Sequence, residues 1–250
     1  MSALGAAGLA AWCFAVALAG GAVGLVLGNL RLPVVIALAS SPAAGGGANI
    51  AISGIAAATA SAAHLRARRV NWRLFAWMAP PSVAGAVAGG YLAGIVPGDL
   101  LLGVIAAVLL YSGLQLLHGE PSRARPEGGA LNLGAAAVAG FVIGLLGGFV
   151  GLILGSLRMP ALLRLVGEAP AKAVGTNLLV GIFVGAAGLV GHLPSAAPDP
   201  KLFGIGAAAS IPGALLGARL TGRLSEPQLV RAIGAVLLVA GAAAAAQAFT

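Results

Sequence analysis

Two arginines, Arg31 and Arg158, lie in uncharged surroundings within two copies of one motif. Residues 20–33 read GGAVGLVLGNLRLP and residues 147–160 read GGFVGLILGSLRMP, so ten of the fourteen positions are identical. An arginine inside an apolar membrane segment is costly and usually marks a functional site. We therefore predict that the two arginines together bind an anion. The alternative that the sequence leaves open is that each arginine anchors its segment by extending its guanidinium to lipid headgroups.

Each motif is predicted to form a helical hairpin around its arginine. Glycines at residues 20, 24 and 28 recur on one helix face, where small residues let backbones approach closely. Pro33 suits the first turn of a new helix, so residues 29–32 should form the turn of the hairpin. The following half-helix should then present its free N–H groups to an anion. The residues expected to shape the two hairpins are Gly20, Gly21, Gly24, Gly28, Pro33, Gly147, Gly148, Gly151, Gly155 and Pro160.

Polar residues near the two motifs complete the predicted substrate site. Asn49 and Asn177 lie where the first full span of each copy is expected to begin. There they could cap the helix, bind the ligand, or do both. The candidate substrate-binding residues are Arg31, Arg158, Asn49, Asn177, Thr176, Ser40, Asn29 and Ser156.

Proton coupling is the role considered for His64 and His192, which end the same span in each copy. A histidine at a span end more often serves as an interfacial or hydrogen-bonded packing residue. All six acidic residues fall in loops or at span ends, which argues against a carboxylate-based proton or sodium relay. The sequence also contains no P-loop, HExxH motif or Cys/His cluster. We therefore expect no metal, no cofactor and no enzymatic activity.

The composition predicts that membrane helices position these residues. Of the 250 residues, 60% are hydrophobic and 8% are charged, whereas about 25% are charged in an ordinary soluble domain. This balance excludes a soluble enzyme and a disordered chain, and the single cysteine excludes an internally disulfide-bonded scaffold. The net charge of +8 comes from short basic runs between apolar stretches, which indicates membrane topology rather than nucleic-acid binding. The expected partners are the lipid bilayer and a small anion, and a homodimer is compatible with the sequence.

The duplication extends over nearly the whole chain. After residue 160 the offset between the copies changes from 127 to 128, which aligns Asn49 with Asn177 and His64 with His192. We predict a first membrane repeat at residues 1–118, a cytoplasmic linker at 119–130 and a second membrane repeat at 131–250. Each repeat should contain a broken-helix hairpin plus three transmembrane helices. The half-helices should cover residues 33–39 and 160–166, and the next spans should begin near residues 48 and 171.

The basic residues favour inverted over parallel repeats. If each copy makes three net crossings, eleven basic residues fall on one face and only Lys201 on the other, with Arg31 and Arg158 at the hairpin tips. Parallel copies would divide the basic residues seven to seven. Because cytoplasmic loops carry an excess of Lys and Arg, we predict an all-α polytopic membrane protein with inverted repeats and both termini outside.

The chain contains two copies of the motif GG-x-VGL-x-LG-x-LR-x-P, each followed by an Asn and later by a His. In these features it resembles the TauE/SafE-type sulfite exporter family across essentially the whole chain. The resemblance implies a multi-pass transporter of the bacterial inner membrane that exports sulfite or small organosulfonates from a site between the repeats. Our mechanistic prediction is alternating access, in which the two hairpins rock against the remaining spans. The alternative is an anion channel, or an uptake carrier for another small anion.

Overall fold

The computed structural model describes residues 2–92, 98–118, 130–150, 154–192 and 199–248, without the side chains of residues 42–43, 98–99, 150 and 188–192. All regular structure in these ranges is helical, which confirms the expected all-α class. The first half contains α1 (Ala3–Val23), α2 (Gly28–Leu38), α3 (Pro42–Arg66), α4 (Trp72–Tyr91) and α5 (Gly98–His118). The second half contains α6 (Leu133–Val150), α7 (Gly155–Pro160), the π-helix η1 (Ala161–Val166), α8 (Pro170–His192), α9 (Pro200–Thr221) and α10 (Glu226–Ala248).

Six helices in the described part of the chain are long and apolar enough to cross a membrane, which takes about 20 residues. Their apolar spans are Ala3–Val23, Ala44–Arg66, Leu100–His118, Pro170–Ala187, Pro200–Thr221 and Glu226–Ala248. Large apolar side chains such as Leu100, Val138 and Val239 are exposed on the outside of the bundle. Such a surface is stable in lipid, and the structure is that of a polytopic membrane protein.

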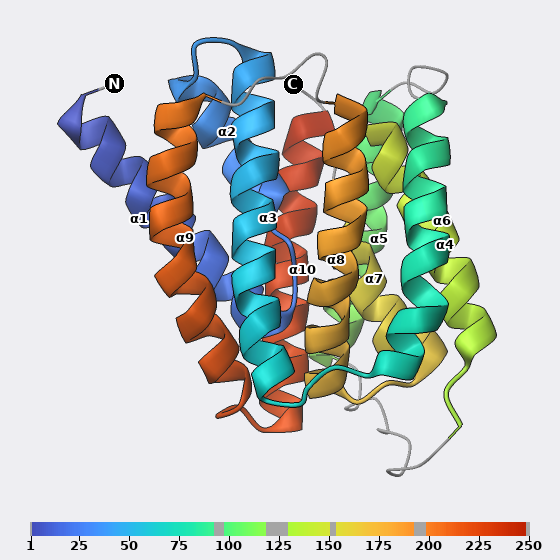
Figure 1. Cartoon of the computed structure of the whole chain (residues 1–250). Coiled ribbons are helices and arrows are strands. Elements are labelled where there is room, and N and C mark those ends of the chain that lie inside the picture. The colour runs from blue at the N-terminus through green and yellow to red at the C-terminus, as the bar shows by residue number, and fades with distance from the viewer. Residues whose placement is uncertain (1, 93–97, 119–129, 151–153, 193–198, 249–250) are drawn as a thin grey trace.

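The two halves enter the bundle from opposite ends (Figure 1). From the N-terminal end, α1 and α2 form a hairpin that returns to that end, and α3 then runs to the opposite end. There α6 begins, and α7 and η1 bring the chain back before α8 runs towards the end that holds both termini. The corresponding helices α3 and α8 therefore run in opposite directions.

The first hairpin bends earlier than the sequence motif predicted. Gly24 ends α1 because it adopts the left-handed conformation, with φ of 74°, and α2 begins at Gly28. The expected turn at residues 29–32 is therefore wrong, and the half-helix expected at 33–39 begins five residues earlier, since Arg31 and Pro33 both lie inside α2. Proline lacks the N–H that would bond to the carbonyl four residues earlier. The Gln247 side chain donates to that carbonyl, on Asn29, at 3.2 Å.

The second half-helix contains one residue more than the first. It covers α7 and η1 without a break, from Gly155 to Val166, so the expected start at residue 160 is also wrong. A π-turn closes its hydrogen bond over one more residue than an α-turn. The π-helix thus accommodates the one extra residue, which shifts the repeat offset from 127 to 128. The next helices, α3 and α8, then begin at equivalent prolines, Pro42 and Pro170.

The helix α3 begins six residues before its expected start. Ser41 caps it, and its hydroxyl accepts from the Ala44 N–H at 3.2 Å. The glycine run that was expected to break the chain is helical instead, and Gly45 lets α2 approach because a Cβ there would lie 3.0 Å from Cα of Ile36. Asn49 therefore lies two turns inside its helix, as Asn177 lies inside α8, and neither asparagine is a cap.

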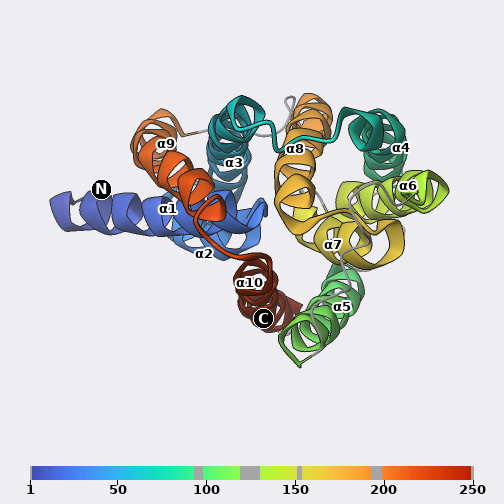
Figure 2. The same cartoon turned by 90° about the horizontal axis from the view of Figure 1, so that it is seen from below.

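The two copies interlock, because the long hairpin helix of each packs on a helix of the other. The closely packed pairs are α1 with α9 and α6 with α4, while α5 packs on α10. In the end-on view of Figure 2, α1 and α9 lie together on one side and α6 and α4 on the other. Gly217 abuts the Leu18 carbonyl, and its counterpart Gly89 abuts the Leu145 carbonyl. Membrane helices without large interface side chains pack in this way.

The basic residues of the described chain gather at one end of the bundle. The α3–α4, η1–α8 and α9–α10 connections all lie at the end opposite the termini (Figure 1). These connections and the adjoining helical turns carry Arg66, Arg68, Arg69, Arg73, Arg164, Lys172, Arg219, Arg223 and Arg231. Lys201 begins α9 at the other end, and Arg123 and Arg125 fall outside the described residues.

Candidate functional site

The first half-site joins α2 to α3. The Arg31 Nε donates to Oδ1 of Asn49 at 3.1 Å, and Nη2 donates to the Ser53 hydroxyl at 2.6 Å. The Asn49 amide donates in turn to the Gly28 carbonyl at 3.1 Å. Asn49 and Ser53 are four residues apart, so they lie on the same helix face. The asparagine thus fixes the guanidinium against the first turn of its own helix.

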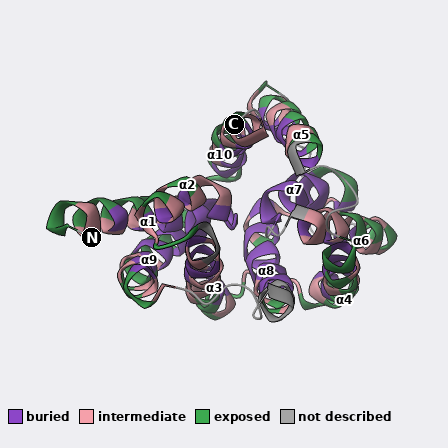
Figure 3. Cartoon of the chain, turned by 90° about the horizontal axis from the view of Figure 1, so that it is seen from above, coloured by how far each residue is buried: buried purple, intermediate pink, exposed green. Residues whose placement is uncertain are grey.

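The second half-site repeats this arrangement between α7 and α8. The Arg158 Nε donates to Oδ1 of Asn177 at 3.0 Å, and the Asn177 amide donates to the Gly155 carbonyl at 2.8 Å. Gly155 is the repeat counterpart of Gly28. Every residue of α7 is buried, and Figure 3 shows α7 and much of α8 in the colour of buried residues. The duplicated motif therefore produces two equivalent arginine–asparagine units.

The second half-site also contacts the first bend directly. The Asn177 amide donates to the Gly24 carbonyl at 2.7 Å. A Cβ on Gly155 would lie 3.5 Å from the backbone nitrogen of Val26. The start of α7 therefore faces the first bend inside the bundle, and the Asn177 side chain ties α8 to that bend.

Both guanidiniums retain a buried nitrogen without a partner. Arg31 and Arg158 are each 1% exposed, and Nη1 of Arg31 and Nη2 of Arg158 make no hydrogen bond. The Cys13 thiol lies near Arg31 but makes no hydrogen bond to it within ordinary geometric limits. No carboxylate among the described residues pairs with either arginine. Burial also excludes the alternative that the two arginines reach lipid headgroups.

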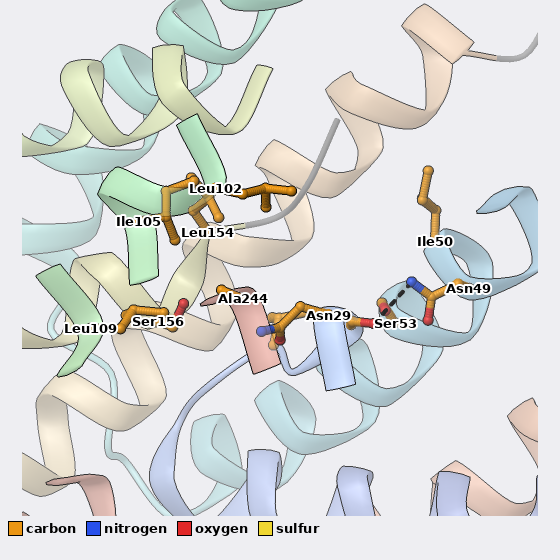
Figure 4. Close-up of a pocket in the computed structure, with 12 residues that line it drawn as sticks. Asn29, Asn49, Ile50, Ser53, Leu102, Ile105, Leu109, Leu154, Ser156 and Ala244 are labelled. Carbon is orange, nitrogen blue, oxygen red and sulfur yellow. Dashed lines mark hydrogen bonds between the residues drawn. The ribbon is translucent and has the colours of Figure 1, made fainter. Parts of the chain in front are cut away.

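A small cavity lies between the first bend and the start of α7, and we call it the outer cavity. Its volume is about 30 Å³, which is room for about two waters at roughly 10–15 Å³ each. Figure 4 shows Asn29, Asn49 and Ser53 on one side and Leu154 and Ser156 on the other. The remaining wall comes from Ile50, from Leu102, Ile105 and Leu109 of α5, and from Ala244 of α10. Residues of both copies therefore line the cavity.

Sequence reasoning located part of this site and missed part of it. Three of the residues predicted to bind substrate, Asn29, Asn49 and Ser156, line the outer cavity, whereas Arg31, Arg158 and Asn177 do not. Ser40 is exposed in the turn between α2 and α3. Thr176 is buried away from the cavity, and its hydroxyl accepts from the Asn71 N–H at 2.9 Å. Ser53 was not predicted as a site residue, although its spacing from Asn49 was a usable signal.

His64 does not join the arginines. His64 is fully buried and its Nε2 lies 3.1 Å from the Gly21 carbonyl, beneath the first bend. The side chain of His192 lies outside the described residues, as does Gly151, the counterpart of Gly24. Within the described chain no group of three His, Cys, Asp or Glu residues could hold a metal ion.

Comparison with known proteins gives a family but no close relative. A family model described as "Sulfite exporter TauE/SafE" matches residues 9–244. No curated protein and no solved structure matches the chain.

Proposed function

Because this chain belongs to the TauE/SafE sulfite exporter family, we propose that it exports small sulfur oxyanions, either sulfite or organosulfonates, from the cell. The family match and the six apolar spans identify a multi-pass membrane transporter of the sulfite exporter type. The substrate, the direction and the mechanism are the proposal.

The proposal rests on the observation that each buried guanidinium has a nitrogen without a hydrogen-bond partner. A hydrogen bond from arginine to an anionic oxygen is charge-assisted and about twice as strong as a neutral one. Nη1 of Arg31 and Nη2 of Arg158 offer such donors, and neither is taken by a carboxylate of the described chain. A sulfur oxyanion has several oxygens around one centre, so it can accept from both half-sites.

Substrate size follows from the outer cavity. Its volume of about 30 Å³ is suited to a compact anion such as sulfite. An organosulfonate also carries a carbon chain, and the α5 and α10 walls would have to move apart to admit it. We therefore expect sulfite to be preferred over larger sulfonates.

Alternating access is the mechanism that this arrangement favours. The bends belong to hairpins that start from opposite ends of the bundle (Figure 1), and carriers built from inverted repeats rock one part against another around a central site. Basic residues concentrate on the cytoplasmic side of membrane proteins, so we assign the basic end to the cytoplasm and both termini to the outside. The protein would then lie in the bacterial inner membrane.

The membrane potential can supply the driving force. With the inside negative, a potential of 100 mV favours the exit of each negative charge by about 2.3 kcal/mol, or about 50-fold in concentration. Export would then need no coupling ion.

The test is transport of labelled sulfite in anaerobic proteoliposomes under an imposed potential. Arg31→Ala and Arg158→Ala should each reduce the rate about 10- to 100-fold, the effect of losing a charge-assisted hydrogen bond of about 1.5–3 kcal/mol. The control is Arg223→Ala, because Arg223 is an exposed arginine of the basic end. Sulfite flux that is unaffected by either buried arginine, or by the potential, would contradict the proposal. Flux that does not saturate would indicate a channel.

A further inference from the structure

A second cavity, which we call the inner cavity, lies on the other side of the first half-site. Its volume is about 20 Å³. Its walls come from α1, the first bend, α3 and Leu178 of α8, and Arg31 and Ser53 supply its polar side chains. The cavity has room for a water or two at roughly 10–15 Å³ each. Arg31 lines this cavity and not the outer one, which reaches the guanidinium only through its partners Asn49 and Ser53.

The two cavities meet at Ser53 and Val26, the residues that line both. Along α3 the outer cavity contacts Asn49, whereas the inner cavity extends to Ala60, towards the basic end. Eleven residues of helix span about 16 Å at roughly 1.5 Å each. The cavities therefore follow one another along the bundle axis, and Ser53 stands at their boundary.

The second half-site has no serine at the position equivalent to Ser53. The repeat position of Ser53 is Gly181, which has no hydroxyl. Nη2 of Arg158 has no partner, whereas Nη2 of Arg31 donates to Ser53 at 2.6 Å. Both arginines bind their asparagine through Nε. The serine hydroxyl thus accepts from a guanidinium nitrogen that is buried and unpaired in the equivalent arginine.

We propose that Ser53 competes with the transported oxyanion for Arg31 and separates an inner from an outer anion subsite. This inference rests on the proposed export function. An anion in the inner cavity first binds Nη1 of Arg31 and then displaces the Ser53 hydroxyl from Nη2 as it passes to the outer cavity. When the hydroxyl returns to Nη2, it releases the anion. Ser53 is therefore a residue that sets affinity and release, and Arg158 remains the uncontested half-site.

Ser53→Ala tests the competition. Removing the hydroxyl should strengthen sulfite binding about tenfold, because the anion no longer displaces a hydrogen bond, and should slow maximal transport several-fold, because release loses its competitor. Ser61→Ala is the matched control, since Ser61 is another buried serine of α3, has no hydrogen-bond partner and lines neither cavity. Binding is measured by calorimetry on the purified full chain with sulfite, and transport in proteoliposomes.

Ala57→Val tests the inner subsite independently. Ala57 lines the inner cavity but not the outer one, so a larger side chain should reduce transport at least tenfold and change equilibrium binding less than twofold. Ala62→Val is the control on an exposed position of the same helix.

The outcomes separate this inference from the proposed function. If wild-type protein neither binds nor transports sulfite, the proposed function fails. If the wild type transports sulfite but Ser53→Ala behaves like Ser61→Ala, or loses affinity, Ser53 does not compete with the anion. Unchanged transport in Ala57→Val would remove the inner cavity from the path.

Discussion

Asn177→Ala should destabilise the protein more than Asn49→Ala, although the two asparagines occupy equivalent positions of the duplicated sequence. Asn177 accepts from Arg158 and donates to the carbonyls of both Gly155 and Gly24. Asn49 accepts from Arg31 and donates only to Gly28. The additional hydrogen bond of Asn177 crosses from the second copy to the bend of the first.

The expected magnitude follows from these contacts. A hydrogen bond to a charged group contributes about 1.5–3 kcal/mol and a neutral one about 0.5–1.5 kcal/mol. Asn49→Ala should therefore lower the free energy of unfolding by about 2–4 kcal/mol, and Asn177→Ala by about 1 kcal/mol more. Arg31 would also keep its bond to Ser53, whereas Arg158 already has an unpaired Nη2.

Thermal unfolding of the purified protein in detergent, followed by tryptophan fluorescence, measures this difference. At about 2–4 °C per kcal/mol for a chain of this size, the Tm of Asn177→Ala should fall that far below the Tm of Asn49→Ala. Equal Tm values, or a lower Tm for Asn49→Ala, would show that the bond between Asn177 and Gly24 does not hold the two bends together.

Two further substitutions test the shape of the first hairpin. Gly24→Ala should destabilise the protein by at least about 3 kcal/mol, because φ is 74° and a Cβ would lie 2.5 Å from Cα of Val174. The control is Gly8→Ala, where a Cβ meets nothing within 4 Å. This substitution should be neutral or stabilise the protein by up to about 1 kcal/mol. Comparable Tm changes for the two glycines would refute the assigned bend. Gln247→Leu should cost about 0.5–1.5 kcal/mol by freeing the Asn29 carbonyl, and the cost should vanish in a Pro33→Ala background, where residue 33 regains its N–H. A loss of Tm that is equal in both backgrounds would show that Gln247 does not substitute for the missing helical bond.

The two copies share the arginine–asparagine unit but differ in the groups around it. The arginine, the asparagine and the glycine carbonyl recur with nearly the same distances in each half. Ser53 faces Arg31, and only a glycine stands at its repeat position opposite Arg158. The two half-sites therefore differ in the second partner of the guanidinium.

Composition and repetition made part of this site predictable. The scarcity of charged residues identified a membrane protein, because a soluble domain of this size needs many more charged side chains on its surface. The duplicated motif identified Arg31 and Arg158, since an ionised group in an apolar span persists only where the protein uses it. The offset of 128 paired Asn49 with Asn177 before any contact was known.

Tertiary packing determined the rest. Gly24 and Pro33 are both ordinary places for a chain to bend, and the close approach of Val174 to Gly24 selects the glycine. Thr176 is adjacent to Asn177 in the sequence, but its hydroxyl faces the α3–α4 connection rather than the arginine. The bond from Asn177 to Gly24 joins residues 153 apart, and local sequence preferences carry no information about such a pair. The sequence by itself determined which side chains are costly to bury, and only the folded chain determined which of them meet.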